Sequence, residues 1–212
     1  MYRFSDIFSN DLPKDPADIS PFNLIVDDTK WKVGKNRAPP RSQSSVKQNA
    51  IFKTIQTLIS QGIVEKSQSP PYSQILMVPK PDGTFRFRND CTADASWPIP
   101  NIAEMLMRIG SQQPKIFGIM DLTQGYHQAP LTLATRAYTS FITFSGVYQF
   151  TRLPFGPKRA PSYFQEIMAT VVLAGLIYMI CEMYIDDCTV FGDTNIEFLS
   201  SSFFFGFIVP HL

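Results

Sequence analysis

The chain has 212 residues, of which 44% are hydrophobic, so it holds enough apolar material for one large domain or two small ones. Its formal net charge of +1 argues against a protein that binds polyanions over its whole surface, yet the charge is unevenly distributed. Residues 29–88 contain eleven Lys and Arg against two acids, so the rest of the chain is net acidic. This polarity is expected where a phosphate-binding surface faces a metal-binding one; the alternative is a solvated basic surface.

The three cysteines are odd in number and form no C-x-x-C pair, which favours a reduced, intracellular setting. The N-terminus has no apolar core of a signal peptide. The longest apolar stretches, 171–180 and 203–209, are too short to cross a bilayer, so no membrane association is expected.

Taken in chain order, residues 1–46 lack periodicity and predict an irregular extension. Apolar residues then recur at helical spacing from about Val46, and Gly62 is a suitable residue to end that helix. Residues 75–78 and 84–88 predict two strands joined by a Lys-Pro-Asp-Gly turn. We expect residues 1–30 to be poorly packed.

A short helix is predicted over residues 102–109, followed by an apolar strand over 116–122 that carries Asp121 near its end. Residues 138–144 and 147–153 flank Ser145-Gly146 and predict a hairpin.

Residues 160–174 predict a helix with a proline in its first turn. Residues 183–191 predict a second hairpin with Asp186 and Asp187 at its tip. Helices and antiparallel strands alternate without a regular βαβ rhythm, so the predicted fold class is α+β.

The sequence Tyr184-Ile185-Asp186-Asp187 is the strongest chemical signal in the chain. Two adjacent carboxylates at a hairpin tip, beside Asp121 on a neighbouring strand, can hold two divalent cations for phosphoryl transfer. The alternative for the Asp pair is a solvated turn.

Several stretches resemble the ordered motifs of reverse transcriptases. Ile-Met-Asp-Leu-Thr-Gln-Gly-Tyr-His-Gln (119–128) is similar to the first catalytic motif, Leu-Pro-Phe-Gly-Pro-Lys-Arg-Ala-Pro (153–161) with Phe-Gln (164–165) to the second, and the Tyr-Ile-Asp-Asp sequence to the third. Residues 62–87 resemble the fingers region. The residues of these motifs are most similar to those of Gypsy-like LTR retrotransposon polyproteins, and the resemblance spans roughly residues 30–193.

The resemblance implies a catalytic and metal-binding role for Asp121, Asp186 and Asp187, which would hold two Mg²⁺ ions, with Mn²⁺ as a substitute. It implies that Lys80 and Arg86 bind the triphosphate of the incoming nucleotide, although either residue is also explained as a surface cation.

Tyr126 matches the aromatic residue that excludes a 2′-hydroxyl, with a core tyrosine as the alternative. Phe155 and Gly156 match positions where the backbone approaches nucleotide and template, and Phe155 is equally explained by packing. Gln165 and Tyr184 complete the second and third motifs. His127 is expected to be structural.

The implied fold is the fingers and palm of a right-hand polymerase, with the thumb absent. The expected boundaries are an irregular extension (1–46), fingers in two parts (47–118 and 131–152), a palm strand with the first aspartate (119–130), a palm helix and hairpin (153–193), and an apolar tail outside the family (194–212).

The chain departs from the family pattern in two places. After Cys91 about six residues of a fingers strand are missing relative to the family, which is expected to disturb strand register. After residue 195 the family continues into further palm, a thumb and RNase H, whereas this chain runs into a phenylalanine-rich end without periodicity, expected to be poorly packed over 196–212. We interpret it as the product of a frameshift, a misread intron or a decayed copy.

The predicted function is RNA-directed DNA polymerase, acting on an RNA or DNA template-primer and dNTPs, within a parent polyprotein that also carries protease, RNase H and integrase. The alternative is a catalytically inactive retroelement remnant that binds nucleic acid weakly. A metal-dependent hydrolase would leave Tyr126, Lys80 and Arg86 unexplained.

Overall fold

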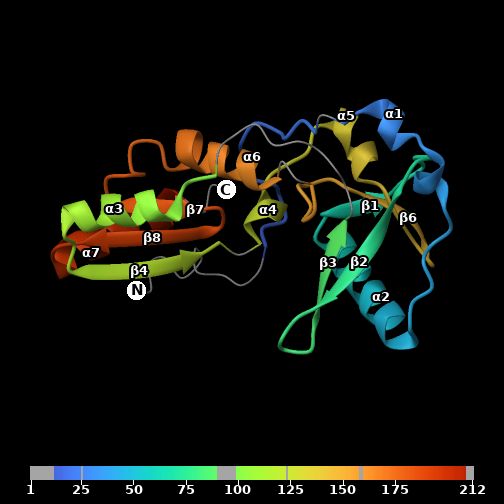
Figure 1. The fold of residues 1–212 in the computed structure, drawn as a ribbon, viewed down its shortest axis with the longest axis horizontal. Helices are drawn as coiled ribbons and strands as arrows, with labels where there is room; N and C mark the ends of the chain where they lie inside the picture. Colours follow the sequence, from blue (N-terminus) through green and yellow to red (C-terminus); the bar gives the residue numbers. More distant parts are fainter. Residues whose placement is uncertain (1–11, 25, 90–98, 123, 158–159, 209–212) are drawn as a thin grey trace.

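The computed structural model describes residues 12–24, 26–89, 99–122, 124–157 and 160–208. These residues form an elongated molecule with two sheets side by side (Figure 1). One sheet has five strands in the order β1-β6-β5-β2-β3, and the other has three strands in the order β4-β8-β7. Helices and mixed or antiparallel strands confirm the α+β class.

The long helix α2 (Ser45–Ser60) packs against the five-stranded sheet. Its three buried residues, Ile51, Ile55 and Leu58, recur at helical spacing, as the sequence predicts. The Ser44 hydroxyl accepts a hydrogen bond from the backbone N–H of Lys47 at the helix start. The helix ends just before Gly62, whose φ of +68° is the left-handed conformation expected after a helix. Two short elements, α1 (Asp28–Trp31) and η2 (Gly34–Arg37), precede it.

The five-stranded sheet joins segments that are distant in the sequence. Its strands are β1 (Val64–Lys66), β2 (Ser73–Pro79), β3 (Phe85–Asn89), β5 (Phe141–Thr143) and β6 (Gly146–Phe150). All pairs are antiparallel except β2 and β5, which run parallel. The β2–β3 pair keeps its register as far as Ile75 opposite Asn89. The deletion expected after Cys91 lies outside the described residues.

The predicted strand over 138–144 is too long. The start of the predicted strand belongs instead to the 3₁₀ turn η3 (Ala137–Thr139), which follows the short helix α5 (Leu133–Arg136). The strand β5 begins only at Phe141. The Thr139 hydroxyl donates to the Arg136 carbonyl and accepts from the Phe150 N–H, so a side chain occupies a place that a strand backbone would take. The hairpin turn is Phe144-Ser145, one residue earlier than predicted, because Gly146 already pairs with Thr143.

The three-stranded sheet contains β4 (Ile116–Asp121), β7 (Cys181–Tyr184) and β8 (Asp187–Gly192). Helix α3 (Ile102–Gln112) lies beside β7, where the Arg108 guanidinium donates to the buried carboxylate of Glu182 at 2.7 Å. Helix α6 (Ala160–Ile167) is shorter than the predicted 160–174 and continues as a π-helical segment, η4 (Met168–Val172). The two sheets and their helices together form the frame of the site.

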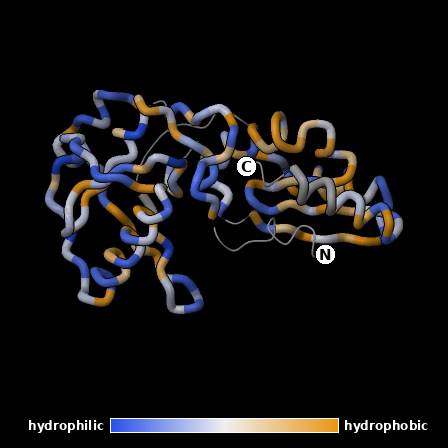
Figure 2. Tube along the Cα trace, turned by 180° about the vertical axis from the view of Figure 1, so that it is seen from behind, coloured by the Kyte–Doolittle hydropathy of each residue, from blue (hydrophilic) through white to orange (hydrophobic). Residues whose placement is uncertain are grey.

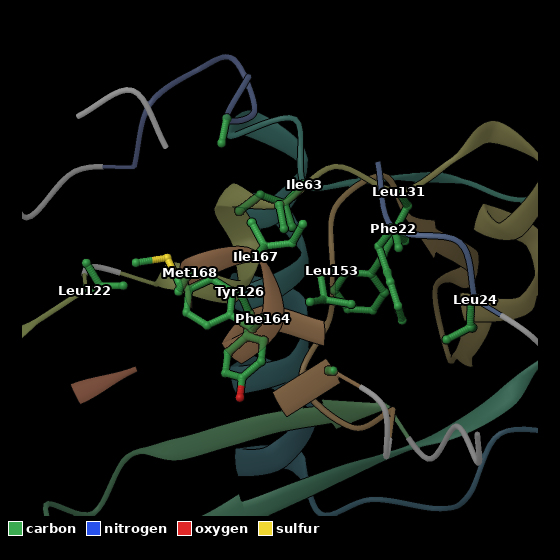
Figure 3. Packing of buried hydrophobic residues seen from close by; sticks show 14 of the residues in the cluster. Phe22, Leu24, Ile63, Leu122, Tyr126, Leu131, Leu153, Phe164, Ile167 and Met168 are labelled. Carbon is green, nitrogen blue, oxygen red and sulfur yellow. The ribbon is translucent and has the colours of Figure 1, made fainter. Parts of the chain in front are cut away.

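A single apolar cluster connects the two sheets. Figure 3 shows residues from widely separated segments, among them Phe22, Tyr126, Leu153, Phe164 and Met168, converging on it. Figure 2 shows hydrophobic residues running along the β4-β8-β7 half, whereas hydrophilic and hydrophobic stretches alternate in the other half.

The expectation of poor packing at the N-terminal end is wrong for the described part of that segment. Ala17, Phe22 and Leu24 are buried in the core. The backbone N–H of Ala17 donates to the carbonyl of Gln128, and that of Phe22 donates to Pro130, so the extended segment is held by the chain beside it. Residues 1–11 lie outside the described residues.

The C-terminal segment, whose sequence lacks periodicity and was expected to be poorly packed, forms a helix, α7 (Asn195–Ile208). Thr194 and Glu197 make a reciprocal cap: the Glu197 N–H donates to the Thr194 hydroxyl, and the Thr194 N–H donates to the Glu197 carboxylate. Phe198 packs over Gly118, where an added Cβ would lie 2.7 Å from the ring. Ile196 and Leu199 remain exposed, so packing is poor on one side only. Residues 209–212 lie outside the described residues.

Among the helices that the structure describes, none combines the length and the apolar character needed to cross a membrane.

Candidate active site

The first and third motifs meet at one end of the three-stranded sheet. Asp121 is the last residue of β4, and its register partner is Asp187, the first residue of β8. Asp187 also faces Tyr184 on β7. Register partners in an antiparallel sheet project from the same face, so the two carboxylates lie on one side of the sheet. Asp186 occupies the turn between β7 and β8.

The turn itself is strained and supported from below. Ile185 has a φ of +60°, a conformation that a β-branched residue rarely adopts. Its backbone N–H donates to the side-chain oxygen of Gln165 at 2.8 Å, while the Gln165 amide donates to the Met183 carbonyl at 3.2 Å. Gln165 is 1% exposed. One buried side chain on α6 therefore fixes both sides of the turn that carries Asp186.

Electrostatic repulsion connects the three aspartates. Partial burial raises the pKa of Asp121, and the negative charges of Asp186 and Asp187 raise it further. Carboxylates in such mutual repulsion suit a bound cation, which would relieve it. Nevertheless, in the described part of the chain no three acidic, His or Cys side chains lie close enough together to hold a metal ion. The three carboxylates are close enough to influence one another electrostatically, but they are not close enough to coordinate one metal ion together.

Asp121 and Asp186 line a cleft of about 500 Å³ between the two sheets. Lys80 and Arg86, from either side of the β2–β3 turn, line the same cleft. Both side chains are exposed, and among the described residues neither forms an ion pair. The fold thus places two free cations opposite two carboxylates.

Tyr126 lies at the floor of this cleft, on the one-turn helix α4 (Gly125–Gln128). It is 6% exposed, and its ring packs against Phe155 and Phe164 with centroids 5.0 Å away in each case. Burial raises the pKa of its hydroxyl, and the charge of Asp186 adds to the effect. Gly125 permits this packing, since an added Cβ would lie 2.9 Å from the Phe164 ring.

The remaining predicted residues divide between the cleft and its support. Phe155 lines the cleft. Asp187, Tyr184 and Gln165 lie at or behind the hairpin rather than in the lining. Gly156 also lies outside the lining, and its φ of +136° shows a backbone conformation that favours glycine.

His127 is buried between aromatic rings, 5.2 Å from Phe155 and 6.3 Å from Phe150 by ring centroids. Burial lowers its pKa to about 4, and the positive charge of Arg152 contributes. Its Nδ1 lies 3.1 Å from the side-chain oxygen of Gln124. A neutral, enclosed imidazole fits the structural role expected for it.

Sequence reasoning missed one wall of the cleft. Thr54, Thr57 and Gln61 of α2 and the following coil line it, opposite the aspartates. Their spacing of three and four residues places them on one face of the helix, next to the buried Leu58, which also lines the cleft. That polar stripe was visible in the sequence, but only the fold shows that it faces the carboxylates.

Comparisons with known proteins agree on the family. The sequence model of the family described as "Reverse transcriptase (RNA-dependent DNA polymerase)" matches residues 48–201, which includes the first residues of α7. The retrovirus-related Pol polyprotein from transposon 297 of Drosophila melanogaster is 34% identical over 158 residues, covering 69% of this chain and 15% of the relative. The corresponding polyprotein from transposon 412 is 33% identical over 205 residues, covering 90% of this chain and 16% of the relative.

Solved structures are similar in fold. The prototype foamy virus protease-reverse transcriptase (a selenomethionine-labelled mutant) superposes with a TM-score of 0.74 at 23% identity, covering 99% of this chain and 28% of that one. A second foamy viral protease-reverse transcriptase, solved in complex with an RNA/DNA hybrid, superposes with a TM-score of 0.71 at 19% identity, covering 98% of this chain and 28% of that one.

The chain spans about one sixth of the length of the two transposon polyproteins. The shared fold agrees with the fingers and palm that the resemblance implies, and we therefore call the five-stranded sheet with α2 the fingers sheet and the three-stranded sheet with its aspartate hairpin the palm sheet. The motif order, the shared fold and the match over residues 48–201 together show that this chain belongs to the reverse transcriptase (RNA-dependent DNA polymerase) family.

Proposed function

We propose that this chain carries the nucleotidyl-transfer site of an RNA-directed DNA polymerase, which adds dNTPs to a primer 3′ end under the direction of a template. The observation that carries the proposal is the pairing of Asp121 with Asp187 across β4 and β8, next to Asp186 in the strained turn. Asp121 and Asp186 line a cleft that Lys80 and Arg86 also line.

Each side chain has a distinct part in the proposed reaction. Asp121, Asp186 and Asp187 would hold two Mg²⁺ ions, or Mn²⁺ in their place, because hard cations take oxygen ligands. When bound there, the metal supplies the Lewis acidity used in in-line phosphoryl displacement. The primer hydroxyl and the α-phosphate of the dNTP would meet at this edge of the sheet.

The cations and the aromatic floor would position the nucleotide. Lys80 and Arg86 would bind the triphosphate through charge-assisted hydrogen bonds, and Phe155 and the Gly156 backbone would border the base and template. Tyr126 would lie under the sugar and exclude a 2′-hydroxyl by steric contact.

The wider setting is also a proposal. A template-primer of RNA or DNA would be the macromolecular partner, and the parent protein would be a polyprotein with protease, RNase H and integrase. The two relatives named above are described as retrovirus-related Pol polyproteins. The compartment would be cytoplasmic, within a virus-like particle, or nuclear.

A second candidate is a catalytically inactive retroelement remnant with weak nucleic-acid binding. One observation favours it: the described carboxylates do not form a ready three-ligand metal site.

Primer extension on an RNA template with Mg²⁺ separates the two. The comparison is between the unchanged chain, the double variant Asp186→Asn with Asp187→Asn, and the control Asp193→Asn, which alters an exposed aspartate just beyond β8. Extension that persists in Asp193→Asn and disappears in the double variant supports the polymerase.

Equal extension by the double variant would refute the assigned site. A folded chain without extension, its fold checked by circular dichroism, would instead support the remnant.

A further inference from the structure

Residues 12–24, here called the N-terminal strap, run along the back of the candidate active site. The strap pairs with the end of α4 and with the chain that follows it: the Ala17 N–H donates to the Gln128 carbonyl at 2.8 Å, and Phe22 forms an isolated bridge with Leu131. On its other side the Tyr163 hydroxyl of α6 donates to the Ser20 carbonyl at 2.5 Å. The strap therefore touches both the helix that carries Tyr126 and the helix that supports the aspartate hairpin.

Arg152 is the junction between this strap and α4. Its guanidinium donates to the carbonyls of Pro13 at 3.1 Å, His127 at 3.3 Å, and Lys14. The residue is 2% exposed, and among the described residues it forms no ion pair. Placing a cation in a buried position is costly unless its donors are satisfied, and here backbone carbonyls satisfy them.

The bond to His127 matters because α4 has only four residues. A single helical turn has too few hydrogen bonds to keep its own shape. The His127 carbonyl is at the end of that turn, where helix carbonyls lack intrahelical partners. Arg152 supplies one, and His127 directly follows Tyr126, so the anchor is one residue from the ring that lines the cleft.

The backbone of Arg152 reinforces the arrangement. Arg152 forms an isolated bridge with Pro130, and the Leu153 N–H donates to the Ala129 carbonyl at 2.9 Å. Leu153 also begins the segment that carries Phe155, which packs on Tyr126 at 5.0 Å. One residue thus connects strap, α4 and the second motif.

We propose that Arg152 is a positioning residue: with the N-terminal strap, it sets the depth at which the Tyr126 ring lies in the cleft, and so the discrimination between deoxyribose and ribose. This rests on the proposed polymerase function. A guanidinium is suited to the task, because its planar fork reaches carbonyls in different directions at once, whereas a lysine offers one point charge.

Two variants remove the junction from either side. Arg152→Met keeps an apolar stem and removes all three bonds. A chain that lacks residues 1–14 keeps Arg152 but removes the Pro13 and Lys14 carbonyls. The control is Arg108→Met, which removes a guanidinium bonded to Glu182 beside α3, away from α4.

The first readout is hydrogen–deuterium exchange of the peptide covering residues 124–131, which needs no activity. We expect exchange there to rise by about tenfold in Arg152→Met relative to the rest of the molecule, because local opening has lost its anchor. The truncated chain should show a similar rise. A truncated chain that also carries Arg152→Met should exchange no faster than the more affected of the two single changes, since both changes break one network. Arg108→Met should leave this peptide unchanged.

The second readout is the ratio of dNTP to rNTP incorporation, expressed as kcat/KM for each. A ratio is independent of the fraction of folded enzyme, so a merely structural role leaves it unmoved. We expect Arg152→Met to lower it by about five- to tenfold, Arg152→Lys to restore part of it, and Arg108→Met to leave it unchanged.

Exchange at 124–131 that rises no more than elsewhere would overturn the proposal, whatever the activity. So would an unchanged sugar ratio in an active Arg152→Met. If the chain without any substitution shows no primer extension, the proposed function is refuted. The exchange comparison would then still decide whether Arg152 anchors α4.

Discussion

The two sheets contribute opposite charges to the cleft, and they do so in different ways. In the three-stranded palm sheet, the aspartates lie at strand ends and in a strained turn that the buried Gln165 holds in place. In the five-stranded fingers sheet, Lys80 and Arg86 lie beside a turn, exposed and, within the described residues, without ion-pair partners. The anionic half is preorganised by a buried support, Gln165, and the cationic half is left open to solvent.

This difference has a physical reason. Carboxylates that repel one another need a rigid support, because the backbone must hold them together until a cation binds. Cations that bind a mobile triphosphate gain from remaining unpaired, since an existing ion pair would have to break first. Substitutions in the palm sheet should therefore mainly lower stability, whereas substitutions of the fingers cations should mainly weaken ligand binding. The following predictions test that difference.

The largest expected effect lies where the sheets meet, at His127. Its folded-state pKa of about 4 lies below the ordinary value of 6.5. The neutral imidazole therefore contributes stability that is complete above pH 6.5 and is lost as the pH falls toward 4. At 1.36 kcal/mol for each pKa unit, the loss is about 3 kcal/mol.

Urea unfolding at several pH values, compared between the unchanged chain and His127→Gln, measures this loss. The variant should have a flatter stability profile between pH 6.5 and 4. Identical slopes would mean that His127 does not titrate at the low value inferred from its burial.

Gln165→Ala should have the next largest effect. It leaves the Ile185 N–H and the Met183 carbonyl without their partner, which costs about 2 kcal/mol of unfolding free energy. The matched change in the fingers is Gln149→Ala. Gln149 is half-buried and bonds Glu65 and Ser67, so its loss should cost less than about 1 kcal/mol. Chemical denaturation measures both, and equal losses would remove the distinction between a supported palm and an open fingers surface.

Lys80→Ala and Arg86→Ala should have the smallest effect on stability, within about 0.5 kcal/mol, because both side chains are exposed. Their expected effect is on the nucleotide, with KM for dNTP rising by roughly ten- to a hundredfold as a charge-assisted contact is lost. Steady-state primer extension measures KM, with Lys53→Ala, an exposed lysine on α2, as the control. A large loss of stability with unchanged KM would reverse the assignment of these cations.

Much of this arrangement was readable from the sequence. The helical spacing of Ile51, Ile55 and Leu58 predicted α2, because a helix that buries one face has apolar residues at a helical repeat, and this repeat is visible in the local sequence. The aspartate hairpin was equally local, since two apolar strands flank a short turn, although the turn is Ile185-Asp186 and Asp187 already belongs to β8. The resemblance to reverse transcriptases supplied Lys80, Arg86 and Tyr126 as site residues, and the fold brings all three to the cleft of Asp121.

Other features depended on contacts between distant segments. The burial of Phe22 requires a partner at residues 130–132, more than a hundred positions away, and no local pattern in residues 12–24 reveals it. The α7 helix had a local signal, the Thr194 and Glu197 cap, but its run of phenylalanines has no period that would mark a buried face.

The sequence by itself determined which chemical groups this chain has and the order in which they come: three aspartates, two cations and a tyrosine within recognisable motifs. Only the tertiary structure decided how they are held. Gln165 under the Ile185 turn, Arg152 between the strap and α4, and the polar stripe of α2 facing the aspartates are relations between elements. Such relations follow from packing, which sequence spacing within any single element does not specify.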